Sequence, residues 1–296
     1  MRISSRTKSL ACTALPLLAA AVSARAEGLT TNAPVIARFG WFHINNSMVI
    51  TWVVALLLIG FARVATAKIR EVPRGAQNFW EWMVGGLFSF LEELLGYALT
   101  KKTFWFFASL FIFILSCNWF GLIPGVGSIG WGQADASGNI AHISEPILRG
   151  ANADFNMTFG IACVFFLFWL IWALQANGPG GFLLHLFGPK GDTTGVLKIL
   201  MIFVFICVGV LEVVSILFRP VSLSFRLYGN IFAGENMLET MALLSPAFGW
   251  LIAIPFYFME LLVGLVQALV FMLLTAVFTL LICDHGDDHG EHSHQH

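Results

Sequence analysis

The stretch TMALLSPAFGWLIAIPFYFMELLVGLVQALVFMLLTAVFTLLIC, residues 240–283, contains one charged residue, Glu260, in 44 positions. As one straight helix it would measure about 66 Å at about 1.5 Å per residue, whereas the hydrocarbon core of a bilayer is about 30 Å thick. The segment therefore either breaks, near Pro246 or Pro255, or lies strongly tilted in a membrane. Residues 199–244 pose the same problem.

Three shorter apolar segments precede this half of the chain. Residues 44–62, 103–123 and 155–177 are each long enough to cross a bilayer as a helix. Only 11% of the 296 residues are charged, against about 25% in a soluble domain. We therefore predict an all-α polytopic membrane protein of five to six helices, with residues 44–283 as the transmembrane domain and the last two helices long and strongly tilted. The 16 basic and 17 acidic residues leave no basic surplus for nucleic-acid binding.

The N-terminal 26 residues have the pattern of a removable signal peptide. Three basic residues precede a short apolar stretch, and Ala24-Arg25-Ala26 offers small residues to a signal peptidase. A retained first helix is the alternative. Residues 27–43 then form an external segment. Residues 63–102 contain six Lys/Arg and residues 124–154 only Arg149, so the first loop is expected in the cytoplasm, the N-terminus outside and the C-terminus in the cytoplasm.

Two segments outside the apolar runs have open readings. Residues 75–100 mix aromatic and acidic residues, which suits an amphipathic helix at the cytoplasmic interface or a soluble helix packed on another subunit. The tail, residues 284–296, contains five histidines and is read as a solvated cytoplasmic terminus. Weak metal binding by the tail is the alternative. The glycine-rich stretches 121–132 and 178–195 are read as loops, and the five cysteines stand singly, with no disulfide framework.

The C-terminal half carries a set of ionisable residues inside otherwise apolar sequence. Each costs about 2.5 to 3.5 kcal/mol to place in a membrane on insertion scales, which makes an ion pathway the default hypothesis and internal ion pairs the alternative. For Arg219 and Glu239 we favour a structural role. The set is Glu212, Arg219, Arg226, Glu235, Glu239 and Glu260.

Arg226 lies in the run SLSFRLYGNIFAGE, residues 222–235. An arginine stays protonated at physiological pH, so it cannot relay protons but can act as a fixed positive charge. Asn230 follows four residues later on the same helix face. The small residues of the run would let another helix approach closely. This combination fits an electrostatic gate against a moving carboxylate on a partner helix.

The run with its Arg-Leu-Tyr-Gly-Asn core resembles the signature of subunit a of F-type ATP synthases. Further matches are Glu212, 14 residues before the arginine, Gln267 in QALVF, and DFNMT at residues 154–158. The resemblance covers about residues 40–283.

The resemblance implies a non-catalytic, proton-translocating subunit. Two half-channels would open on opposite faces of the membrane, and Arg226 would meet a carboxylate of a c-subunit ring, against which the two tilted helices pack. Glu235 and Glu260 match a pair proposed for one half-channel, which in many members contains one histidine. Two such carboxylates repel, so one is expected to hold a proton, which suits a proton relay and equally a structural pair sharing a proton. Gln267 and Asn230 would give polar support near Arg226, and Glu212 is a candidate for the opposite half-channel.

The implied partners are the c-subunit ring, b-type peripheral stalk subunits and the soluble catalytic head, in a bacterial inner membrane. No cofactor or metal is expected. A self-contained transporter would show internal repeats and broken helices at the midplane, and we find no repeat. A metal exporter would place ligands in the spans, and no predicted span contains histidine.

Overall fold

The computed structural model describes residues 35–39, 42–123, 126, 130–134, 140–146, 149–187, 196–244 and 248–284. The predicted signal peptide and residues 285–296 of the histidine-rich tail lie outside these ranges, so both hypotheses on them remain predictions. Five helices in the described part are long and apolar enough to cross a membrane. The chain is therefore an all-α polytopic membrane protein, as predicted.

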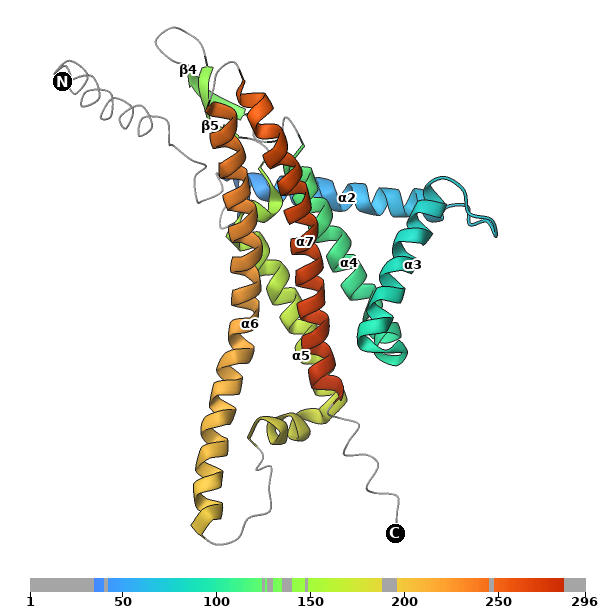
Figure 1. The fold of residues 1–296 in the computed structure, drawn as a ribbon, viewed down its shortest axis with the longest axis vertical. Helices are drawn as coiled ribbons and strands as arrows, with labels where there is room; N and C mark the ends of the chain where they lie inside the picture. The colour runs from blue at the N-terminus through green and yellow to red at the C-terminus, as the bar shows by residue number, and fades with distance from the viewer. Residues whose placement is uncertain are drawn as a thin grey trace, which may run out of the picture.

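The helices are arranged as a bundle from which one pair diverges (Figure 1). The bundle contains α4 (Tyr97–Gly121), α5 (Phe155–Phe187), α6 (Val196–Leu243) and α7 (Gly249–Asp284). The helix α2 (Asn46–Thr66) runs away from the long axis and leads into α3 (Ala76–Leu95), which lies beside the lower part of α4 (Figure 1). The amphipathic stretch 75–100 thus contains a helix, as predicted, which ends at Gly96 with a φ of 75°.

The apolar C-terminal half is divided between two long helices. The helix α6 is continuous over 48 residues, with Pro220 inside it, and α7 continues over 36 residues past Pro255. The chain leaves helical geometry after Leu243 and re-enters it at Gly249, so of the two predicted break points Pro255 is wrong, and Pro246 lies outside the described residues. At about 1.5 Å per residue α6 is about 72 Å long, which exceeds the hydrocarbon thickness of about 30 Å.

The predicted loops differ in part from the structure. The helix α5 kinks at Gly178 (φ 70°, ψ 163°), before Pro179, and then continues to Phe187, so the first part of the predicted loop 178–195 is helical. Proline disfavours helical geometry in the residue before it, and glycine tolerates a positive φ, which together explain the kink. The second predicted loop, 121–132, begins at the last residue of α4 and ends inside a strand, β4 (Gly130–Ala134).

Short strands pair at the end of the bundle where α6 ends and α7 begins. The strands β1 (Val35–Phe39) and β2 (Phe42–Asn45) form one antiparallel hairpin, with Ala37 opposite Ile44. The strands β4 (Gly130–Ala134) and β5 (Ile140–Pro146) form another, with Gly130 opposite Pro146. A single 3-10 turn, η1 (Ala151–Ala153), leads from this second hairpin into α5.

The core of the bundle is built from aromatic side chains of α4 and α5. Phe107, Phe165 and Trp169 are fully enclosed, and Trp172 packs edge-on against Phe106. Aromatic pairs in these geometries add about 0.5–1.5 kcal/mol each beyond their buried area.

Side-chain N–H groups of α4 and α5 also bind backbone carbonyl oxygens of α7. The Asn118 amide donates to Gly264 O at 2.9 Å and the Trp119 indole to Leu261 O at 3.1 Å. Farther along α7, the Trp169 indole donates to Phe278 O at 3.0 Å and the Asn177 amide to Ile282 O at 2.9 Å. These four bonds fix the position of α7 against its neighbours.

Candidate functional site

Arg226 lies on a face of α6 that the other described residues leave uncovered. Arg226 and Asn230 are both exposed, and Ser222 and Ala233 extend the same exposed stripe. The opposite face is enclosed in the bundle, where Leu227 is 1% exposed. A cation therefore stands among small side chains on a helix surface, as the run 222–235 predicts.

The other predicted polar residues can be placed along α6 relative to Arg226. The helices α6 and α7 run antiparallel (Figure 1), and the Glu260 carboxylate packs on Gly234. Counting seven residues along each helix from this contact brings Gln267 level with Leu227, next to Arg226. At about 1.5 Å per residue, Glu235 lies about 14 Å from Arg226 along the axis and Glu212 about 21 Å in the opposite direction. The structure therefore separates Glu212 from the other predicted site residues.

Glu235 and Glu260, which we call the carboxylate pair, lie where the C-terminal part of α6 packs on α7, because the Glu260 carboxylate contacts Gly234, the residue before Glu235. Glu260 is only 4% exposed, and its carboxylate occupies the space that a Cβ on Gly234 would need. Within the described residues, no group donates a hydrogen bond to the buried Oε1 of Glu260. A buried carboxylate oxygen without a protein partner costs free energy unless a proton, a water or a ligand satisfies it.

Glycines also line the space around Glu235. Its Oε1 lies against the Cα of Gly150, where an added Cβ would collide with it. A Cβ on Gly121 would lie 3.5 Å from the same oxygen and 3.1 Å from the Cα of Gly150. The charges of Glu260 and Glu239 act on Glu235 as well. The carboxylate pair thus sits among bare backbone from α4, α6 and the segment before η1.

A chain of amide side chains lies beside the carboxylate pair. Asn152 Nδ2 donates to Asn118 Oδ1 at 2.6 Å, and Asn118 donates in turn to Gly264 O, one turn after Glu260. Asn118 and Asn152 are buried, at 2% and 1% exposed. Neither residue was predicted from the sequence, because Asn118 carries no charge in its apolar run and Asn152 lies in a polar segment where an asparagine is ordinary.

Asp154 joins the start of α5 to the start of α2. Its Oδ2 accepts from Ser47 Oγ at 2.7 Å and its Oδ1 from the backbone N–H of Asn156 at 3.0 Å. The second bond is an N-terminal cap of α5. The motif DFNMT therefore begins with a carboxylate that is buried and occupied by two donors.

Arg149 differs most from its sequence-based interpretation. It was counted as a charge of an external loop, yet it is 3% exposed, and its guanidinium carbon lies 5.8 Å from the centre of the Phe232 ring. Its charge acts on Glu235. Its position next to Gly150, six residues before the apolar run of α5, was the signal that could have identified it.

Arg219 is half-buried and packs against aromatic rings from two other helices. Its guanidinium carbon lies 4.4 Å from the ring centre of Phe278 on α7 and 5.4 Å from that of Trp169 on α5. Glu212, two helical turns earlier, acts on its charge. Arg219 is thus held by packing inside the bundle, in contrast to Arg226.

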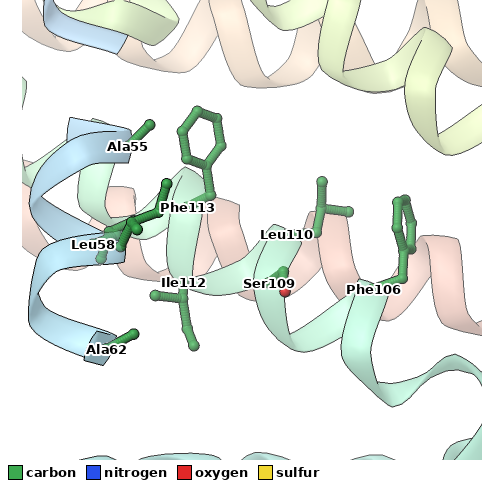
Figure 2. A pocket seen from close by; sticks show the side chains of 9 residues that line it. Ala55, Leu58, Ala62, Phe106, Ser109, Leu110, Ile112 and Phe113 are labelled. Atoms are coloured by element: carbon green, nitrogen blue, oxygen red, sulfur yellow. The ribbon is translucent and has the colours of Figure 1, made fainter. Parts of the chain in front are cut away.

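A cavity of about 430 Å³ opens between α2 and α4 (Figure 2). Apolar side chains line it, among them Leu58, Leu110 and Phe113. The one hydroxyl, of Ser109, already donates to Trp105 O at 2.6 Å. Since its lining has no ionisable group, this cavity offers no path to a proton.

Comparisons with known proteins find similarity over most of the chain. The family described as ATP synthase A chain matches residues 48–279. A relative named ATP synthase subunit a from Gloeobacter violaceus is 31% identical over 245 residues, covering 83% of this chain and 86% of the relative. Relatives of the same name from Solidesulfovibrio magneticus (31%; 83% and 88% covered) and Trichlorobacter lovleyi (33%; 79% and 85% covered) are similar to it over comparable lengths.

Proposed function

Because this chain belongs to the subunit a family of ATP synthases, the proton-translocating subunits of the membrane sector, we propose that Arg226 is the fixed cation that couples proton flow to movement of a partner ring. The observation that carries the proposal is the exposure of Arg226 on a face of α6 with no other charge between Ser222 and Ala233. A ring carboxylate that approaches this face would lose its hydration, and the positive charge of Arg226 would compensate for that loss. The exposed Asn230 and the nearby Gln267 would supply neutral hydrogen-bond partners on either side.

The carboxylate pair would form the inner end of one half-channel. Glu260 has a buried oxygen that accepts no hydrogen bond from the described residues, which is the state expected of a group that takes up a proton. Glu235 stands beside it, so a proton can pass between two like groups that cannot both be ionised at low cost. We favour relay over a structural shared-proton pair for this reason.

Glu212 would serve the opposite half-channel. It lies on α6 on the other side of Arg226, about 21 Å away along the axis. A proton can then reach Glu212 from the carboxylate pair only by way of the ring, because Arg226 stands between the two.

The subunit would catalyse no covalent step itself. Its partners would be the c-subunit ring on the exposed face of α6, the b-type stalk subunits and the soluble catalytic head. We place it in a bacterial inner membrane, with the carboxylate pair toward the outside and Glu212 toward the cytoplasm, from the asymmetry of Lys and Arg between the loops.

The test is ATP-driven proton pumping and passive proton leak in membrane vesicles that contain the assembled complex. Arg226→Ala is expected to abolish pumping and to raise the leak, because the charge barrier between the half-channels is gone. Arg219→Ala is the matched control, seven residues away on the same helix, and should still pump. If assembled Arg226→Ala complexes pump like the wild type, Arg226 is structural and the proposal is wrong.

A further inference from the structure

The segment that leads from β5 into η1 brings a buried arginine to the carboxylate pair. Arg149 is 3% exposed, although the sequence around it had the pattern of an external loop. Removing a charged guanidinium from water costs several kcal/mol unless other groups compensate. Such a residue is expected to serve a specific neighbour.

Two contacts hold Arg149 and Glu235 at the same place. Phe232, whose ring faces the guanidinium at 5.8 Å, precedes Glu235 by three residues and so shares its side of α6. The next residue after Arg149, Gly150, has its Cα against Oε1 of Glu235. Arg149 and Gly150 therefore contact α6 at two points one helical turn apart. The guanidinium of Arg149 faces the Phe232 ring, and the backbone of Gly150 faces the Glu235 carboxylate.

The charges that act on Glu235 come from three directions. Glu239 lies on its own helix, Glu260 on α7, and Arg149 on the segment before η1. Asp154, the nearby carboxylate of α5, is already bound by Ser47 and the Asn156 N–H. Among the described groups that act on Glu235, Arg149 supplies the one positive charge.

We propose that Arg149 is a positioning residue for proton uptake, which holds the Glu235 carboxylate against Gly150 and balances the negative charges of Glu239 and Glu260. This proposal rests on the proposed role of the carboxylate pair. A nearby cation favours the ionised form of a carboxylate, and nearby anions favour the protonated form. Without Arg149, Glu235 would take up a proton readily but pass it on slowly.

The experiment is ATP synthesis by the purified complex in liposomes, driven by an acid–base jump, with the pH varied on the side where Glu235 lies. For Arg149→Gln we expect the pH of half-maximal rate to move upward by about one unit, the lower end of the shift that one opposite charge produces. Arg149→Lys keeps the charge and should keep the wild-type midpoint. Arg219→Gln is the matched control, a half-buried arginine against aromatic rings away from Glu235, and should leave the midpoint unchanged.

A second variant separates the failure of this proposal from failure of the proposed function. In an Glu235→Gln background, Arg149→Gln should cause no further shift, because the group it acts on is gone. An Glu235→Gln complex with a wild-type pH profile would remove the proposed role of Glu235. A changed Glu235→Gln profile, together with an unshifted Arg149→Gln midpoint, would overturn only the role of Arg149.

Assembly provides the remaining readout. If Arg149→Gln alone fails to assemble, the double variant with Glu235→Gln should restore assembly, because it removes both members of the charge pair. Loss of assembly in the double variant as well, with assembly of Glu235→Gln alone, would make Arg149 a packing residue and overturn the proposal.

Discussion

Arg219 and Arg226 lie two turns apart on one helix, and their surroundings are opposite. The guanidinium carbon of Arg219 lies 4.4 Å from the ring centre of Phe278 and 5.4 Å from that of Trp169. Arg226 faces outward from the bundle with Ser222 and Asn230 beside it. The free energy of placing an arginine in an apolar segment is the same at both positions when judged from the sequence. The difference between the two arginines therefore comes from the side chains that neighbouring helices place around them.

The contrast indicates how a membrane helix can carry two arginines for two purposes. At Arg219 the aromatic faces replace water as the partner of the cation, which joins α5, α6 and α7. At Arg226 the rest of the chain provides no such cover, so the charge is left for a partner outside the chain. Only the second arrangement can respond to a charge that comes and goes.

The largest effect is expected from changing the shape of each cation while keeping its charge. Arg226→Lys should lower ATP-driven pumping at least about tenfold, because a compact ammonium does not reproduce the planar fork of a guanidinium toward a carboxylate. Arg219→Lys should change pumping less than about twofold, because an ammonium can also lie over the face of an aromatic ring as a cation–π contact. The measurement is initial pumping rate per assembled complex. Equal losses at both positions would erase the comparison.

An intermediate effect is expected where the end of α6 meets α7. Gly234→Ala places a methyl group where the Glu260 carboxylate now lies. Overpacking of this kind costs about 1–3 kcal/mol, and 1.4 kcal/mol is about a factor of ten in rate, so pumping should fall roughly tenfold. Gly160→Ala on α5, where an added Cβ meets no atom within 4 Å, is the control. Wild-type pumping by Gly234→Ala would show that the packing of the Glu260 carboxylate on Gly234 is not needed for proton transport.

The smallest effect on transport and a clear one on stability are expected from removing Arg219. Arg219→Leu keeps the volume near the rings of Phe278 and Trp169 but loses the cation–π contacts, worth about 0.5–2 kcal/mol at a half-buried site. Thermal inactivation of the purified complex should occur at lower temperature, while pumping per surviving complex stays near the wild-type rate. A loss of pumping without loss of heat resistance would assign Arg219 to the transport path.

Much of the fold followed from apolar length and charge alone. The spans at residues 46–66, 97–121 and 155–182 lie within a few residues of the predicted ones, and the amphipathic stretch 75–100 contains α3. Whether the C-terminal half would break or continue could not be decided, because Pro220 and Pro255 are both tolerated inside helices here. In a membrane, neighbouring helices help to satisfy the backbone groups that a proline leaves without a hydrogen bond. That contribution is not visible in a single sequence.

The candidate site was predictable where a residue is costly by itself. Arg226, Glu235 and Glu260 stand out because an ionisable group in an apolar run needs a reason. Arg149 and Asn118 do not stand out in this way. The first lies in a polar segment that folds inward onto α6, and the second is neutral, so their importance follows only from contacts with other elements, α6 for Arg149 and η1 and α7 for Asn118.

The four side-chain bonds to backbone oxygens of α7 have a mechanical consequence. They bind the helix at Leu261 and Gly264, near its middle, and at Phe278 and Ile282, near its C-terminal end. A pull along the axis of α7 loads all four bonds together, so the helix resists shear as one rigid bar and does not slide residue by residue. Under torque from a turning partner, α7 would therefore keep Glu260 at a constant height, and elastic strain would be stored elsewhere in the assembly.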